Sequence, residues 1–222
     1  MKRFSVYILI LCCIFISSVS FAAEKVALDA KLVIVSGLVK LTHADSNEAD
    51  FVDESCQLYS GDVIETLSDA KAKLSYSDGT SMRIKEKTLV EVQPKSIRIF
   101  KGSTWHKFTK RGTEFRIETP SFVAGIKGTE FEVKVDSAKS SLSVFEGAVA
   151  VRGNNSGDVL LAEGKETYCD AKGNVSDAKD FNVTLKKSSW YISEWNSSEP
   201  ESDKSTPKMK KTIKTLSKPT KR

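Results

Sequence analysis

Histidines and carboxylates are the side chains of this sequence that could do acid–base or metal chemistry, and their spacing supports neither. The chain holds two histidines, His43 in a polar segment and His106 two residues before Phe108 in a strand-like run. Neither belongs to a metalloprotease, zinc-site or serine-hydrolase motif. Each is therefore predicted to be a surface or partly packed side chain. The chain is predicted to be no enzyme and to use no cofactor.

Two further segments resemble ion-binding loops only in part. Residues 45–54 are rich in carboxylates but lack the regular spacing and central glycine of a calcium loop, so an exposed loop without a specific metal site is predicted. Residues 125–129 have the sequence GIKGT, whereas a phosphate-binding loop needs Gly directly before Lys and a helix after it. Strand-forming residues follow instead, so Lys127 is predicted to be an exposed turn residue.

The amino-terminal residues have the order of a secretory signal. Two basic residues precede an apolar run over residues 4–16, which is too short to span a bilayer comfortably. Small residues at Ser20 and Ala22 suit cleavage after Ala22. Residues 1–22 are therefore predicted to be a signal peptide, and the mature chain to be exported to the periplasm or the cell surface. An uncleaved amino-terminal anchor is the alternative.

Removal of the signal would leave two cysteines, Cys56 and Cys169, in an oxidising compartment. A disulfide between them would tie an early loop to a late one, and closing so long a loop contributes about 4 to 5 kcal/mol at most in the chain-entropy model. Two separate thiols are the alternative, because the sequence does not show whether the side chains come close.

Charge is distributed unevenly along the chain. From residue 204 onward there are eight basic residues and no acidic ones. Residues 197–222 are rich in Ser, Thr, Pro and Lys and poor in large apolar residues, so a disordered tail is predicted. The tail is either a solvated terminus or a contact for an anionic envelope surface. The candidate contacts are Lys208, Lys210, Lys211 and Lys214.

Nucleic acid is not expected as a partner of this tail. Export would remove the chain from nucleic acid, and no aromatic residues interleave the lysines.

Short runs of alternating apolar and polar residues fill most of residues 23–196. In residues 130–135, for example, Phe131, Val133 and Val135 alternate with charged residues, which is the period of a β-strand. Turn signals recur at about the 8 to 12 residue spacing of all-β proteins. An all-β fold of many short strands is predicted, either an elongated sandwich or an irregular β-solenoid.

One segment near the end of this region departs from the alternation. Tyr191, Ile192 and Trp195 have helical spacing, which predicts one short helix over residues 189–195, capped by Ser188 or Ser189. Its aromatic side chains are expected to pack onto the β body. A surface aromatic patch for a ligand is the alternative.

Several motifs lie at the junctions between the strand-like runs. Asp78-Gly79 predicts a type I′ hairpin turn, Gly125 and Gly128 predict a sharp corner, and Glu146-Gly147 predicts a turn between two strands. In this order the motifs resemble the core of the FecR domain, over about residues 31–174. The residues that carry the resemblance, all expected to be structural, are Gly61, Asp62, Asp78, Gly79, Thr119, Pro120, Gly125, Gly128, Thr129, Phe131, Glu146 and Gly147.

The resemblance implies a function in binding. Proteins similar to the FecR sensor join a periplasmic part, which meets an outer-membrane receptor, to a short cytoplasmic part that controls a sigma factor. Only three residues precede the apolar run here, so a stand-alone FecR-like domain over residues 23–196 is expected, without that anti-sigma region.

The expected function is that of an exported, non-catalytic module of the bacterial envelope, which binds an envelope protein or a cell-wall polymer. One alternative is a periplasmic component of cell-surface signalling that works with a separate membrane partner. The other alternative is an enzyme acting on envelope polymers.

Overall fold

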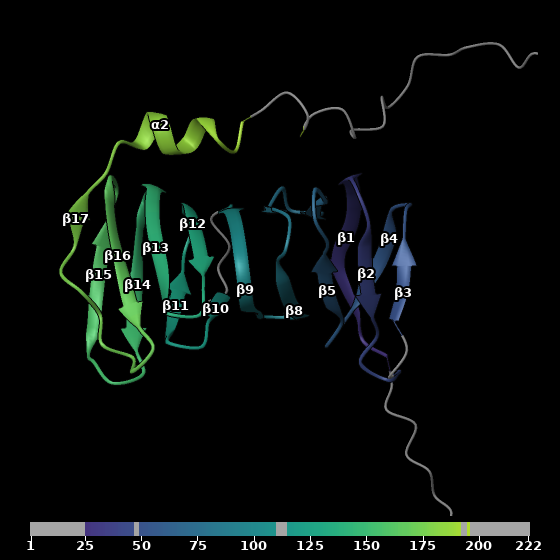
Figure 1. Ribbon diagram of the computed structural model, residues 1–222, viewed down its shortest axis with the longest axis horizontal. Coiled ribbons are helices and arrows are strands. Elements are labelled where there is room, and N and C mark those ends of the chain that lie inside the picture. Colours follow the sequence, from purple (N-terminus) through teal and green to yellow (C-terminus); the bar gives the residue numbers. More distant parts are fainter. Residues whose placement is uncertain (1–24, 47–48, 110–114, 192–194, 196–222) are drawn as a thin grey trace, which may run out of the picture.

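In the computed structural model, short strands and tight turns follow one another along the described chain, which comprises residues 25–46, 49–109, 115–191 and 195. The strands form two layers that share one strand, β9 (Ser96–Lys107) (Figure 1). Layer A contains, in spatial order, β4 (Cys56–Tyr59), β1 (Ala27–Ser36), β6 (Lys71–Tyr76), β7 (Ser81–Ile84), the second half of β9, β12 (Glu130–Val135), β13 (Lys139–Glu146), β16 (Lys165–Asp170) and β17 (Lys179–Asp180). Layer B contains β3 (Ala49–Val52), β2 (Val39–Thr42), β5 (Val63–Thr66), β8 (Leu89–Gln93), the first half of β9, β10 (Phe115–Glu118), β11 (Phe122–Ile126), β14 (Ala148–Gly153) and β15 (Asp158–Ala162).

The shared strand β9 holds the two layers together. It pairs with β8 and β10 before Gly102, and with β7 and β12 from Gly102 onward. Gly102 has φ +99°, a conformation that L side chains rarely adopt, and this lets the strand turn from one layer into the other. Beyond β9, the chain places one hairpin in layer B and the next in layer A: β10–β11, β12–β13, β14–β15 and β16–β17.

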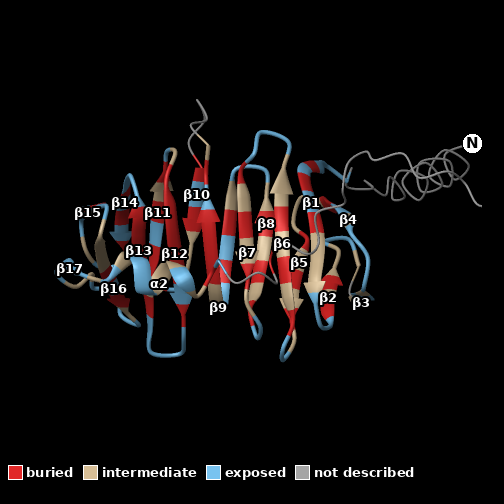
Figure 2. Cartoon of the chain, turned by 90° about the horizontal axis from the view of Figure 1, so that it is seen from above, coloured by how far each residue is buried: buried red, intermediate tan, exposed pale blue. Residues whose placement is uncertain are grey.

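The core lies between the layers. Strands such as β7 and β10 alternate buried and less buried residues, as Figure 2 shows, so one side of each strand faces inward. Leu32, Ile64, Leu74, Ile97 and Phe122 are among the fully buried side chains of this core. The prediction of an all-β fold is confirmed, and of the two arrangements left open, the elongated sandwich is the one observed.

Three local predictions were wrong. The acidic segment predicted as a loop contains β3, an edge strand paired with β2, and charged residues are common on edge strands because they discourage further pairing. The β6–β7 turn is not of type I′, because Gly79 has φ +84° while Asp78 is outside the left-handed region. The helix α2 spans Val183–Ser188 and is capped by Asn182, so it begins and ends earlier than predicted.

The predicted signal peptide, residues 1–22, and the predicted disordered tail, residues 197–222 with its four candidate lysine contacts, lie outside the described residues. Within the described residues there is no helix of the length and apolar character that crossing a membrane requires.

Candidate functional site

Part of the outer face of layer A is covered by the chain itself. The covering segment consists of β17, α2 and the residues that follow, through Tyr191, together with Trp195. Figure 2 looks onto α2, which lies over β12 and β13. Trp190 and Trp195 are buried against Trp105 and Phe145. The aromatic residues therefore pack onto the β body, as predicted, although they follow the helix instead of lying within it.

Ion pairs and hydrogen bonds fasten this covering segment to β12. Lys187 Nζ lies 2.8 Å from Glu130 Oε1, and the Tyr191 hydroxyl donates a hydrogen bond of 3.0 Å to the same oxygen. Trp105 Nε1 donates another, of 3.2 Å. Glu130 is only 3% exposed. Partial burial of the Tyr191 phenol, together with the charge of Glu130 beside it, raises the pKa of Tyr191 to about 12. Glu130 is thus a satisfied structural carboxylate.

A second cation on layer A is enclosed by aromatic rings. The Arg83 guanidinium lies 4.6 Å from the ring centre of Trp105, 4.8 Å from that of Tyr191 and 5.7 Å from that of Trp195. It also donates a hydrogen bond to the Trp190 carbonyl. Burial lowers the pKa of Arg83. The part of layer A beneath the covering segment is therefore filled by contacts within the chain.

Motif residues from β12, β13 and the turns beside them meet at one place. Gly128 and Gly147 have φ +64° and +86°, both in the region that favours glycine. A Cβ on Gly147 would lie 2.9 Å from Thr129 Cγ2, so the two turns touch. Phe131 is buried beside them in the core. Gly125 differs from the prediction, because it lies inside β11 and not at the corner.

The remaining motif residues build turns. Gly61 has φ +86° between β4 and β5, and Asp62 accepts a 2.8 Å hydrogen bond from the Tyr59 amide. Asp78 accepts hydrogen bonds from Thr80 in the β6–β7 turn. The Thr119 hydroxyl accepts a 3.0 Å bond from the Phe122 amide, across Pro120.

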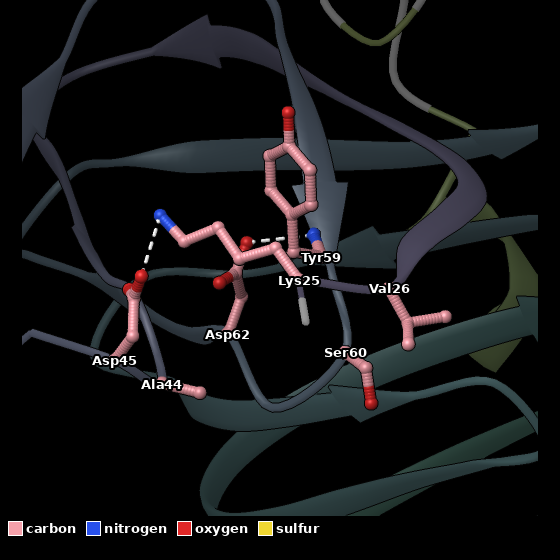
Figure 3. A pocket seen from close by; sticks show the side chains of 7 residues that line it. All are labelled: Lys25, Val26, Ala44, Asp45, Tyr59, Ser60 and Asp62. Carbon is pink, nitrogen blue, oxygen red and sulfur yellow. Dashed lines mark hydrogen bonds and ion pairs between the residues drawn. The ribbon is translucent and has the colours of Figure 1, made fainter. Parts of the chain in front are cut away.

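A small cavity of about 180 Å³ lies beside the Gly61-Asp62 turn (Figure 3). Its polar groups are already engaged with one another. Lys25 Nζ pairs with Asp45 at 3.0 Å, and the second oxygen of Asp62 lies 2.9 Å from His43 Nδ1. The cavity therefore offers no unsatisfied charge to a ligand.

His106 is fully buried, which corrects the prediction of a surface or partly packed side chain. Its ring stacks on Phe131 at 4.8 Å, and Nε2 lies 2.9 Å from the Thr104 hydroxyl. Burial lowers the pKa of His106 to about 3. The imidazole is neutral at physiological pH and is not accessible to a substrate, so the role of His106 is structural.

Cys56 and Cys169 are free thiols, so the proposed disulfide is not formed. Cys56 lies on β4 and Cys169 on β16, near opposite ends of the sandwich (Figure 1). Burial raises the pKa of both thiols. Cys169 donates a hydrogen bond of 3.1 Å to the Ser121 carbonyl. The alternative of two separate thiols describes this structure.

The outer face of layer B, by contrast, carries no covering segment in the described part of the chain. We call it the open face. One row of outward side chains crosses it, in the order Glu91, Arg98, Glu118, Val123, Arg152 and Asp158. The next row is Ser96, Arg116, Gly125, Ala150 and Leu160.

Charges in the first row are paired. Arg98 contacts Glu91 at 3.2 Å and Glu118 at 3.0 Å, and Arg152 contacts Asp158 at 2.6 Å. In the second row, Arg116 is exposed and forms no ion pair with a described residue. Sequence reasoning missed this arginine, since alternation only places it on the outside of its strand.

A hollow of about 400 Å³ lies next to Arg116 on the open face. Its lining residues are Arg116, Val123, Gly125, Ala150, Arg152 and Asp158. Among the described residues, no three histidine, cysteine, aspartate or glutamate side chains come together as a metal site would require. The arrangement suits recognition by surface charge and shape.

The chain is thus a two-layer β-sandwich in which one face is partly covered and the other is open. Comparison with known proteins shows which family this structure resembles. Residues 62–150, from β5 into β14, match the family model described as FecR protein. The matched part is less than half of the chain, and it contains the β9 crossover and most of the hollow. The resemblance drawn from the motifs extended further, over about residues 31–174. Comparison with curated proteins finds no match.

Two solved structures share the fold. Both are of a candidate anti-sigma factor from Parabacteroides distasonis, with TM-scores of 0.51 and 0.50 and sequence identities of 17% and 18%. Each match covers 58% of this chain and 63% of the other chain, which is less than two thirds of its length. At this identity the likeness concerns the fold alone.

Proposed function

We propose that the chain is an exported, non-catalytic binding module of FecR type, which contacts a protein partner through the open face of layer B. The single observation that supports this most is the difference between the two faces. The chain's own aromatic and basic residues cover part of layer A, whereas layer B presents an uncovered charged surface with a hollow in it. Specific protein contacts use such mixed surfaces, in which charges set orientation.

A role in cell-surface signalling is the second candidate. The FecR domain and the fold shared with candidate anti-sigma factors favour it. In this role the module would sense or relay the state of a receptor, and a separate membrane partner would carry the signal inward. Deletion of the gene would then change transcription of a defined regulon. An unchanged transcript profile under envelope stress and nutrient limitation would count against this role.

Site-specific photo-crosslinking in the producing cells tests the proposed interface. A photoreactive residue replaces Val123, which is 37% exposed on the open face, or Tyr168, which is 41% exposed on layer A. We expect a discrete protein adduct from position 123 and none from position 168. Equal labelling at both positions, or no adduct at position 123, would refute the interface.

Export is tested separately, by fractionation and amino-terminal sequencing of the purified chain. A mature chain that begins at Ala23 in the envelope fraction is the expected result, and a chain retained in the cytoplasm contradicts it. The same crosslinking experiment on a chain that lacks residues 204–222 shows whether the basic tail takes part in binding.

A further inference from the structure

The hollow on the open face owes its shape to two small residues. In the register of β10, β11, β14 and β15, Arg116 lies beside Gly125, Gly125 beside Ala150, and Ala150 beside Leu160. Neighbouring side chains on one face of a sheet normally fill the space above the strands. Among the described residues, no side chain fills the space above Gly125 and Ala150, between Arg116 and Leu160, which is 73% exposed. A glycine within a strand often marks a place where another chain approaches closely.

Arg116, beside the hollow, also differs from the other two arginines described on this face. Arg98 and Arg152 each hold a carboxylate, and the Asp158 contacts to Arg152 are a bidentate pair of 2.6 and 2.7 Å. These contacts lower the pKa of Asp158 and raise that of Arg152. Arg116 has no carboxylate among the described residues, although its side chain borders hollows on both sides, of about 400 and 420 Å³. Its guanidinium is permanently charged and has room beside it for an acceptor that forms two hydrogen bonds with it.

We propose that Arg116, above the floor formed by Gly125 and Ala150, binds the carboxylate of an Asp or Glu side chain from an extended segment of the protein partner. This inference rests on the proposed function and names the chemistry of its contact. The exposed Leu160 and Val123 flank the floor and receive the apolar neighbours of that acidic residue.

The acidic residues near Arg116 favour binding of a single carboxylate over binding of a polyanion. Glu118 and Asp158 lie at the margins of the two hollows, so a nucleic acid or a polyphosphate would bring further negative charge close to them. An isolated carboxylate reaches Arg116 without that repulsion. The hollow is open to solvent and shallow, which fits a residue presented on a protein segment better than a small molecule that needs enclosure.

Titration with a peptide tests the contact directly. The probe is the capped peptide Ala-Val-Glu-Val-Ala, which carries one carboxylate between apolar neighbours. It is added to the purified, isotope-labelled chain, and the Arg116 side-chain Nε–Hε and Gly125 amide signals are followed by NMR. We expect saturable shifts of both signals with the glutamate peptide, and shifts at least tenfold weaker in affinity with the matching glutamine peptide. Equal binding of the two peptides overturns the proposal.

Three variants separate the hollow from general surface charge. Arg116→Gln removes the cation, and Gly125→Val fills the floor with a residue that suits a strand, since Gly125 lacks a positive φ. Both are expected to weaken glutamate-peptide binding at least tenfold. Lys101→Gln removes one positive charge from the same face, where Lys101 pairs with Glu65 away from the hollow, and should change affinity less than twofold. Equal losses in all three variants would indicate unspecific charge attraction and overturn the proposal.

The crosslinking experiment distinguishes failure of this contact from failure of the proposed function. If the adduct from position 123 persists unchanged in Arg116→Gln, the open face binds a partner but the arginine contact is wrong. If the otherwise wild-type chain gives no adduct from position 123, the proposed interface itself is wrong. Loss of the adduct in Arg116→Gln, with unchanged thermal stability, supports both.

Discussion

Substitution of Gly102 by alanine should destabilise the whole sandwich, because this residue is where β9 passes from layer B to layer A. Its φ of +99° is unfavourable for any residue with a Cβ, at a cost of about 1–2 kcal/mol. An added Cβ would also lie 2.5 Å from Thr88 Cα, which is backbone that cannot rotate away. Overpacking of this kind costs about 1–3 kcal/mol. The sum is a loss of about 2–5 kcal/mol in the free energy of unfolding.

Two other glycines separate these contributions. Gly164 has φ +74° with no heavy atom within 4 Å of an added Cβ, so Gly164→Ala tests the backbone conformation alone. Gly157 has the same open space without a positive φ, so Gly157→Ala should change stability by less than about 0.5 kcal/mol. We expect the loss of stability to increase from Gly157→Ala through Gly164→Ala to Gly102→Ala.

Urea unfolding followed by circular dichroism and tryptophan fluorescence measures these differences. For a chain of this size, a loss of about 2–5 kcal/mol lowers the midpoint of thermal unfolding by about 4–20 °C. Equal stability of Gly102→Ala and Gly164→Ala would refute the steric argument at the crossover. A Gly102→Ala chain as stable as wild type would refute the role of this residue altogether.

Three further predictions concern the core, a turn and the covering segment. Gly128→Val places a β-branched residue at φ +64° and should lower the thermal midpoint and the yield of folded protein; a wild-type midpoint would contradict this. Lys187→Ala leaves the buried Glu130 carboxylate without its cation and should cost about 1–3 kcal/mol in urea unfolding. Lys165→Ala is its control, because the Asp180 partner is 83% exposed, and should cost less than about 0.5 kcal/mol; similar losses in both variants would argue against the buried pair. His106 has a folded pKa of about 3, below the 6.5 of an unfolded histidine, so its contribution to stability is present above pH 6.5 and is lost as pH falls from there toward 3. The difference in unfolding free energy between wild type and His106→Gln should therefore shrink over that range, and a constant difference would show that the pKa of this histidine is the same in the folded and unfolded states.

Strands and turns were accessible from the sequence because both are local. Alternation over residues 71–76 and 81–85 corresponds to β6 and, but for the last residue, to β7, and Gly147 occupies the turn between two strands as expected. The period of two reports which side of a strand is apolar, and a glycine at a junction reports where the backbone needs positive φ. Phe181, Val183 and Leu185 also alternate with polar residues in the sequence, as in a strand, yet Val183 and Leu185 lie in α2. There the Asn182 cap and the packing of the aromatic residues decide the conformation.

Which charged residues are buried and which form ion pairs could not be predicted from the sequence. Glu130 and Lys134 alternate identically with the apolar residues of β12, yet Glu130 is buried beneath the covering segment and Lys134 is exposed. Arg98 and Arg116 both point outward from layer B, yet among the described residues Arg98 meets two carboxylates, one from β8 and one from β10, and Arg116 meets none.

The sequence by itself determined that this chain is built of short strands joined at glycine turns, and that residues 62–150 carry FecR motifs. Only the tertiary structure decided that β9 belongs to both layers, that Cys56 and Cys169 stay apart, and that one face is covered while the other is open. The physical reason is the range of the interactions. Strand period and turn conformation depend on neighbours in the chain, whereas burial and ion pairing depend on register between strands far apart in sequence.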